Sequence, residues 1–233
     1  MAQAGKSQGK HAGEWYGPFG TANVLKQLAD SDPKFSPRTY VTSDGIIQVQ
    51  DLVTLEEGVT MEELFKRQPE QKMKMEPTLI LVATRLGIDR VNPIYFRFIK
   101  TCLSSKLCVG IAGGKPSSAL YFIGFEGDDL VYLDPHFNKP KINRRNSYSE
   151  YNSADVASYR CSEMKKTHIS RIDPCMFVGF YIDSVDSLLS LYLTLKPFES
   201  VVILSTEPPV CEVGAGTSVD DLGVLSGGDD DSF

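Results

Sequence analysis

The hydrophobic pattern of the chain alternates between a helical period and runs typical of strands. Apolar residues recur at helical spacing in residues 21–28, 93–103 and 183–195, which places them on one face of a helix. The first of these segments follows Gly17-Pro18, so we expect Thr21 or a neighbour near its N-terminal cap. Thr60, with Glu63 three residues later, forms a capping-box pattern and predicts a short fourth helix.

Apolar runs predict the strands. Residues 78–83 form a run typical of a strand buried on both faces. Further strands are expected at 108–111, on both sides of a turn at 127–129, and at 176–182. The alternation over 38–53, around Asp44-Gly45, predicts a hairpin. Residues 201–204 are expected to close the sheet. Together these elements predict an α+β fold with a mostly antiparallel sheet and flanking helices.

Polar stretches divide the chain. Residues 144–158 are rich in Asn and Ser and predict a loop, and residues 68–77 predict an exposed link. No basic residue follows Lys196, whereas eight acids do. Because Gly, Ser and acids dominate its end, we expect residues 206–233 to form an acidic disordered tail. Residues 1–205 would then form the folded domain.

Composition excludes several classes of protein. The net charge of −6 and the pI near 5.2 argue against a nucleic-acid binder. No apolar run approaches the roughly 18–20 residues that cross a bilayer, and no apolar core follows the N-terminal charges as in a signal peptide. A cytoplasmic protein is therefore expected. The five cysteines include no C-x-x-C pair, so no metal site is expected and the thiols are expected to be reduced.

Asp134-Pro135-His136 is the triplet most suggestive of chemistry. On an extended strand, residues two apart point to the same face, and Pro135 favours an extended conformation at Asp134. The carboxylate would fix the tautomer of the imidazole and stabilise its cation. The alternative is a strand-end turn with an incidental histidine.

No cysteine has the surroundings expected of a nucleophile. Cys102 lies near the C-terminal end of its predicted helix, where the dipole disfavours a thiolate. Cys108 lies in an apolar strand, and Cys161 and Cys175 lack a helix-opening context. We therefore interpret these cysteines as structural.

Residues 113–118, Gly-Gly-Lys-Pro-Ser-Ser, resemble a phosphate-binding loop only superficially. The first glycine of that motif would fall at Val109, and Pro116 replaces its Ser or Thr. We expect no nucleotide and no other cofactor. A glycine-rich turn beside the histidine strand is the preferred interpretation.

Several motifs together resemble the autophagy-related cysteine proteases, or autophagins. They are the segment 2–18, which ends in Glu-Trp-Tyr-Gly-Pro, Gly-Gly-Lys-Pro-Ser-Ser-Ala-Leu-Tyr-Phe-Ile-Gly at 113–124 and Tyr-Leu-Asp-Pro-His at 132–136. The segments at 78–87 and 173–180 also fit, so the resemblance covers residues 2–205. It implies a papain-like fold and a thiol protease. The expected activity is to process a ubiquitin-like autophagy modifier after its C-terminal Gly and to release it from phosphatidylethanolamine.

The resemblance also implies roles for individual residues. Asp134 and His136 match the catalytic acid and histidine of the family, and Trp15 matches a tryptophan over the substrate cleft. The cleft would be completed by a glycine pair and a regulatory loop, formed here by Gly113, Gly114, Lys115, Pro116, Ser117, Ser118 and Ala119. The expected partner is the modifier, free and lipid-conjugated, with membrane contact only through this substrate.

One part of the family pattern is missing. The family nucleophile lies upstream, in a Gly-Trp-Gly-Cys-Met-like segment that opens a helix, and these 233 residues do not contain it. We therefore expect the chain alone to be inactive as a protease. The alternative is a non-catalytic module that binds the modifier without cutting it.

Overall fold

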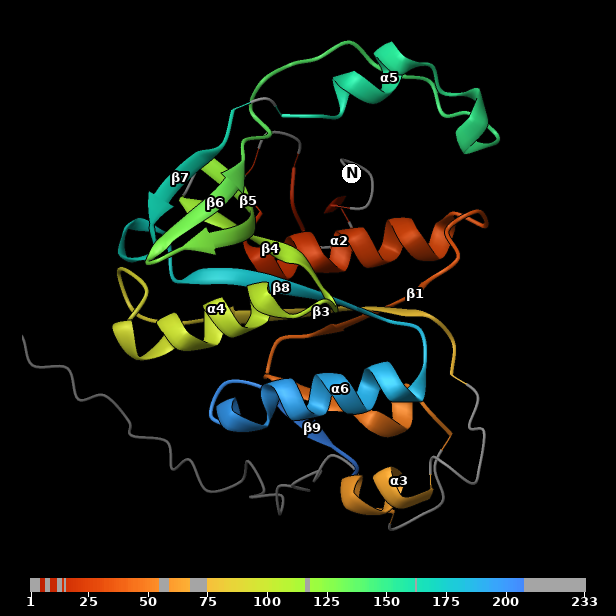
Figure 1. The fold of residues 1–233 in the computed structure, drawn as a ribbon, viewed down its shortest axis with the longest axis vertical. Coiled ribbons are helices and arrows are strands. Elements are labelled where there is room, and N and C mark those ends of the chain that lie inside the picture. The colour runs from red at the N-terminus through yellow and green to blue at the C-terminus, as the bar shows by residue number, and fades with distance from the viewer. Residues whose placement is uncertain are drawn as a thin grey trace, which may run out of the picture.

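The computed structural model describes residues 5–6, 9–11, 14, 16–54, 59–67, 75–115, 118–161 and 163–207 (Figure 1). Its centre is a sheet of seven strands in the order β1-β3-β8-β4-β5-β6-β7. Its strands are β1 (Arg38–Thr42), β3 (Thr78–Arg85), β4 (Cys108–Lys115), β5 (Ser118–Glu126), β6 (Asp129–Leu133), β7 (Lys165–His168) and β8 (Cys175–Ile182). Within this sheet, only the β1–β3 pair is parallel. The expected α+β class with a mostly antiparallel sheet is confirmed.

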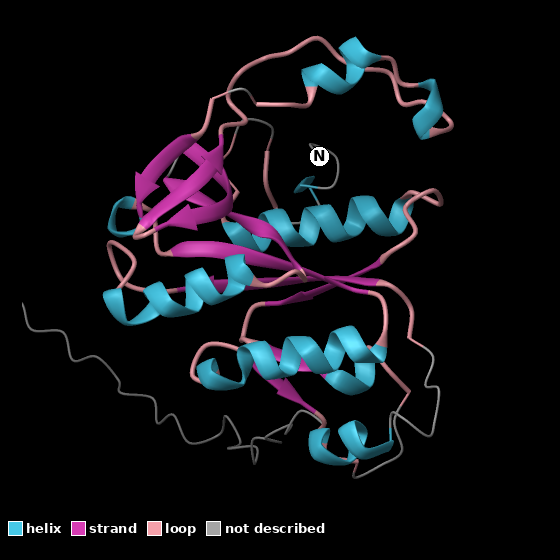
Figure 2. Ribbon diagram, in the orientation of Figure 1, coloured by secondary structure: helices cyan, strands magenta, loops and turns pink. Residues whose placement is uncertain are grey.

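Helices cover both faces of this sheet. Helix α2 packs on one face, and α4 and α6 pack on the other (Figures 1 and 2). The helices are α2 (Pro18–Ser31), α3 (Met61–Arg67), α4 (Phe96–Ser104), α5 (Ser153–Ser158) and α6 (Val185–Leu195). Short 3-10 turns lie at Val49–Asp51, Pro93–Tyr95, Tyr148–Glu150, Ile169–Arg171 and Lys196–Phe198. Within the described residues, no helix has the length and apolar character needed to cross a membrane.

Strands β3 and β8 form the centre of the core. Strand β3 has neighbours on both edges, and four consecutive residues, 80–83, are buried. This confirms the prediction of a strand buried on both faces. Phe180 in β8 and Phe98 in α4 are completely or almost completely buried, so the core joins the sheet to the helices below it.

The predicted helix starts are confirmed, with one shift. Helix α2 begins at Pro18, three residues before the expected cap at Thr21, because a proline at the first helical position costs no hydrogen bond. At α3 the capping box forms as predicted. The Thr60 N–H donates to the Glu63 carboxylate over 3.1 Å, and the Glu63 N–H donates to Thr60 Oγ1 over 3.3 Å.

The predicted hairpin at 38–53 is wrong. A turn does form, since Gly45 has φ +78 and Asp44 accepts hydrogen bonds from Thr42 Oγ1 and the Ile46 N–H. However, β1 then pairs with β3, while β2 (Ile46–Gln48) leaves the main sheet and pairs with β9 (Ile203–Ser205). The turn therefore separates two sheets.

Residues 201–204 do not close the main sheet, contrary to the prediction. Strand β9 forms a separate two-stranded sheet with β2, and the Ile203 N–H donates to the Gly45 carbonyl. An apolar run favours a strand but does not select its partner.

The segment predicted as a loop at 144–158 contains helix α5. Asn152 and Asp155 form a reciprocal capping box at its start, which stabilises a helical turn in a polar sequence. Strand β7 was not predicted, because Lys165-Lys-Thr-His lacks an apolar alternation. Residues 68–74 and 208–233 lie outside the described residues, so the link and the acidic tail stay predictions.

Candidate functional site

The glycine pair lies in a strand and not in a turn. Gly113 and Gly114 belong to β4, where they pair with Leu120 and Ala119 of β5. Gly114 has φ +127, and a Cβ atom there would lie 2.4 Å from the Ser118 carbonyl oxygen. Only glycine fits this close approach without strain.

The expected regulatory loop is the connection between these two strands. Lys115 is the last residue of β4, and it pairs with Ser118 at the start of β5. Ser118 and Ala119 are therefore strand residues, not loop residues as expected. Pro116 and Ser117 lie outside the described residues.

Asp134 and His136 contact each other, but not through an extended strand. Strand β6 ends at Leu133, and Pro135 and His136 form a turn. In this turn Asp134 Oδ1 accepts a hydrogen bond from the His136 N–H over 3.1 Å. The shared strand face that the sequence predicted is wrong. An Asp side chain that bonds the backbone two residues ahead makes a local turn of its own.

The two side chains meet through the same oxygen. His136 Nδ1 lies 2.6 Å from Asp134 Oδ1, and Lys165 Nζ lies 3.6 Å from Oδ2. The His136 N–H, the imidazole and then the Lys165 ammonium hold the pKa of the Asp134 carboxyl below its usual value. The carboxylate therefore stays ionised beside the imidazole at neutral pH.

This contact sets the chemistry of the ring. With the carboxylate at Nδ1, the neutral imidazole carries its proton there, which leaves Nε2 as the basic nitrogen. The His136 side chain is 45% exposed and that of Asp134 21%. The pair can thus serve as a base and its orienter, with the base accessible from outside.

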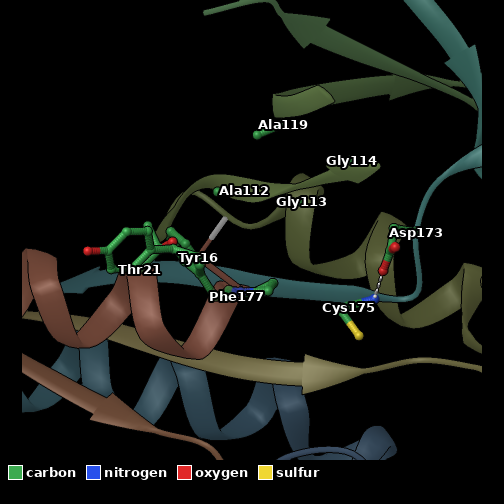
Figure 3. Close-up of a pocket in the computed structure, with 10 residues that line it drawn as sticks. Tyr16, Thr21, Ala112, Gly113, Gly114, Ala119, Asp173, Cys175 and Phe177 are labelled. Carbon is green, nitrogen blue, oxygen red and sulfur yellow. Dashed lines mark hydrogen bonds between the residues drawn. The ribbon is translucent and has the colours of Figure 1, made fainter. Parts of the chain in front are cut away.

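A narrow pocket of about 80 Å³ lies at the end of β4 and the start of β5 and β8. Figure 3 shows it between β4, β5, β8 and the N-terminal segment. It is lined by Tyr16, Pro18, Thr21, Ala112, Gly113, Gly114, Ala119, Asp173, Cys175 and Phe177. Three of the predicted cleft residues, the two glycines and Ala119, therefore lie together.

The strand register relates the pocket to the pair. Ala112 of β4 pairs with Tyr121 of β5, and Tyr121 pairs with Leu133 of β6. Gly113 follows Ala112 in β4, and Asp134 follows Leu133 at the end of β6, so both come next in the same direction. The Asp134–His136 pair therefore lies at the same end of these strands as the pocket, although neither Asp134 nor His136 lines it.

The described cysteines do not have the properties of an activated thiol. Burial is the main cause that raises the pKa of Cys102, Cys108 and Cys175. Cys175 lines the pocket, but its sulfur points away from Gly113 and Gly114 (Figure 3). The thiol of Cys161 donates to the Glu163 carbonyl. Cys211 lies outside the described residues.

Some residues of the site were not predicted. Lys165 comes from β7, which the sequence pattern did not indicate. Thr21 lines the pocket from α2, where the sequence predicted only a helix cap. Tyr16, Asp173, Cys175 and Phe177 lie in two segments that carry the family resemblance, 14–18 and 173–180, so the resemblance could have pointed to them. Trp15 lies outside the described residues.

The described part of the chain holds no group of three His, Cys, Asp or Glu side chains that could ligate a metal ion. The geometry of the Asp134–His136 pair is compatible with acid–base chemistry at the imidazole.

Comparisons with known proteins agree on one family. Residues 1–193 match the Peptidase C54 catalytic domain. A probable cysteine protease atg4 from Botryotinia fuckeliana is 31% identical over 97% of this chain and 50% of its own length. A probable cysteine protease atg4 from Sclerotinia sclerotiorum is 37% identical over 75% of this chain and 37% of its own length. Cysteine protease 1 from Neurospora crassa is 33% identical over 95% and 42%.

The chain spans half or less of the length of these relatives. The similarity covers most of the described residues, including the glycine pair and the Asp134–His136 turn.

Proposed function

This chain belongs to the Peptidase C54 family of papain-like cysteine proteases, and we propose that it carries the acid–base half of a protease of the autophagy pathway. Its substrate is a ubiquitin-like autophagy modifier. The protease cleaves after the C-terminal Gly of the modifier, both in its precursor and in its conjugate with phosphatidylethanolamine.

The observation that carries this proposal is the 2.6 Å contact between Asp134 and His136. It supplies a base whose tautomer is fixed and whose second nitrogen is accessible. A papain-like mechanism needs this arrangement, since a thiol must lose its proton to become a nucleophile.

The reaction proceeds in two steps. A cysteine thiol gives its proton to His136 Nε2, and its sulfur attacks the carbonyl carbon of the terminal Gly. The C–N bond of this carbonyl then breaks, and the leaving amine takes the proton from the imidazolium, which Asp134 stabilises. Water, deprotonated by His136, hydrolyses the resulting thioester and frees the thiol.

Small residues explain a preference for glycine. The pocket of about 80 Å³ is lined by Gly113, Gly114 and Ala119, and a narrow slot excludes side chains from the tail that enters it. Trp15 and the loop at 115–119 are proposed to close over this tail. Trp15→Ala should therefore weaken the discrimination between Gly-ended and Ala-ended substrates.

The partners follow from this activity. The protease contacts membranes only through its lipid-conjugated substrate, it binds no nucleic acid, and it acts in the cytoplasm. Residues 1–205 provide the protease part, and residues 206–233 form an acidic extension.

The nucleophile is proposed to lie outside these 233 residues. The raised pKa of three of the described thiols supports this view, and the chain alone would then be inactive. The same observation favours the second candidate, a module that binds the modifier without cutting it.

Substitution of His136 tests the catalytic role. In a longer protein that carries a Gly-x-Gly-Cys segment ahead of residue 1, His136→Ala should lower kcat by about 10³-fold or more, because the thiol loses its base. Binding of the modifier, measured by calorimetry, should be retained. His11→Ala, at an exposed histidine, is the control and should leave turnover unchanged. Normal turnover of the His136 variant would contradict the assignment.

The isolated chain separates the two candidates. Residues 1–233 should bind the modifier but leave a modifier precursor uncut in a gel assay. Cleavage by this chain would show that one of its own five cysteines acts as the nucleophile, and single Cys→Ser variants would identify it. If the longer protein also fails to cleave while binding persists, the binding module is the correct function.

A further inference from the structure

Residues 137–161 lie in the connection between β6 and β7 and contain α5, and we call this segment the arm. Figures 1 and 2 show that it extends away from the sheet. It begins with a basic stretch in which Lys139, Lys141, Arg144 and Arg145 occur without an acid. The protease mechanism assigns no role to it.

Ser147 follows two arginines in the sequence Arg144-Arg-Asn-Ser147. It is the only serine or threonine of the chain with an arginine three positions before it. Serine kinases with an acidic substrate groove select substrates by such a charge pattern. The pattern therefore distinguishes Ser147 from every other hydroxyl of the chain.

The structure presents this sequence to a kinase. Residues 138–145 have no helical or strand structure, Ser147 itself has an extended backbone with φ −138 and ψ 160, and Tyr148 is 96% exposed. Ser147 is exposed too. A kinase groove binds its substrate as an extended segment. The residues before Ser147 already have this form, and the single 3-10 turn at Tyr148–Glu150 is the element that has to open.

The surroundings of Ser147 suit a phosphate. A hollow of about 440 Å³ is lined by Lys34, Arg144, Arg145, Asn146, Ser147, Tyr148 and Tyr151. Arg144 is 3.0 Å from Asp32, and Arg145 is 3.6 Å from Asp155. The Lys34 ammonium, like Arg144, helps to lower the pKa of the Asp32 carboxyl. Three cations thus line the hollow beside the Ser147 hydroxyl.

One acid opposes the added charge. Glu150 Oε1 lies 3.3 Å from Ser147 Oγ, and two negative groups at that distance repel each other. The Glu150 side chain is exposed, so it can turn toward water and leave the hollow to the phosphate.

We propose that Ser147 is a phosphorylation site for an arginine-directed serine kinase. The kinase transfers the γ-phosphoryl group of ATP to Ser147 Oγ. The bond between the γ-phosphorus and the bridging oxygen breaks, ADP leaves, and the hydroxyl proton passes to the kinase base. The phosphoserine carries about −1.5 to −2 charges at neutral pH. It displaces Glu150 and pairs with Lys34 and Arg145, which ties the arm to the end of α2.

Labelling tests the site. The whole chain is incubated with radioactive ATP and the catalytic subunit of cyclic-AMP-dependent protein kinase, which serves as the probe. Incorporation should approach one phosphate per chain and map to Ser147 by mass spectrometry. Ser147→Ala should lower it at least ten-fold, as should Arg144→Ala, whereas the control Ser149→Ala should incorporate normally. Label at another residue, or none, would overturn the site.

Hydrogen exchange tests the consequence. Phosphorylation should slow amide exchange of residues 144–151 several-fold. Lys34→Ala should be labelled normally but lose this protection. Unchanged exchange in the phosphorylated chain would overturn the tie to α2 while leaving the site intact. Phosphate labelling and hydrogen exchange do not depend on protease activity. Their results therefore test the phosphorylation site independently of the proposed function.

Discussion

At the scale of single residues, the Asp134 carboxylate has the most closely defined surroundings at the site. It accepts two hydrogen bonds from one histidine, and an ammonium group stands on its other side. All three contacts stabilise the charged form. The imidazole can therefore become a cation during a reaction without leaving its position.

The pKa of Asp134 should rise most in the variants that remove its strongest contacts. The pKa of this carboxyl, observed by carbon NMR, should lie below its usual value in the wild type and rise slightly in Lys165→Ala. It should rise further in His136→Ala, yet stay low, because the backbone N–H of residue 136 is the largest cause and remains.

The sign of the effect on stability follows from this shift. Because folding lowers the pKa, the ionised carboxylate stabilises the fold above its usual pKa, and this contribution is lost as the pH falls through the lowered value. Urea unfolding of Asp134→Asn should accordingly depend less on pH, as the pH falls below the usual pKa of an aspartate, than that of the wild type. An equal dependence in both proteins would contradict the contact.

At the scale of elements, the β4–β5 hairpin places the site. The glycine pair lies in β4 where Gly114 leaves no room for a Cβ atom against β5, and both glycines line the pocket. Tyr121 of β5 pairs with Ala112 of β4 and with Leu133 of β6. Asp134, which follows Leu133, therefore lies at the same end of the sheet as the glycine pair. A short strand connection and a positive φ at Gly114 thus decide the shape of the pocket.

Gly114→Ala should strain this hairpin. The new methyl would meet the Ser118 carbonyl at 2.4 Å in a backbone conformation that alanine avoids, at a cost of about 1–3 kcal/mol. The thermal midpoint should fall by about 2–4 °C for each kcal/mol. Gly124→Ala is the matched control, since a Cβ there meets no atom within 4 Å. Equal midpoints for the two variants would show that the hairpin is not strained at Gly114.

At the scale of the whole molecule, one core links the sheet to the helices on one face. Phe180 lies on β8, an inner strand of the sheet, is fully buried, and belongs to the same cluster as residues of α4 and α6. The second sheet, β2 with β9, contributes Ile47 and Leu204 to that cluster. The two sheets should therefore unfold together.

Phe180→Ala should show how much this core contributes. Removal of a buried aromatic ring costs about 3–5 kcal/mol, a large part of the 5–15 kcal/mol that typically stabilises a domain. The urea midpoint should fall sharply. Ile88→Ala is the control, because this side chain is 80% exposed and should change stability by less than about 0.5 kcal/mol. Similar midpoints for both would place Phe180 outside the cooperative core.

The sequence by itself determined what depends on neighbours along the chain. The starts of α3 and α4, the buried strand β3, the turn at Gly127 and the contact between Asp134 and His136 all rest on residues within a few positions of one another. Caps, turns and apolar spacing are local interactions, so a local pattern contains them.

Only the tertiary structure decided which strands pair and which side chains meet. β1 pairs with β3 and β2 with β9, although a hairpin was expected, and Lys165 reaches Asp134 from a strand that no apolar pattern marks. Pairing depends on partners far away in the chain and on the helices that cover each face. These long-range contacts decide between arrangements that are locally equivalent.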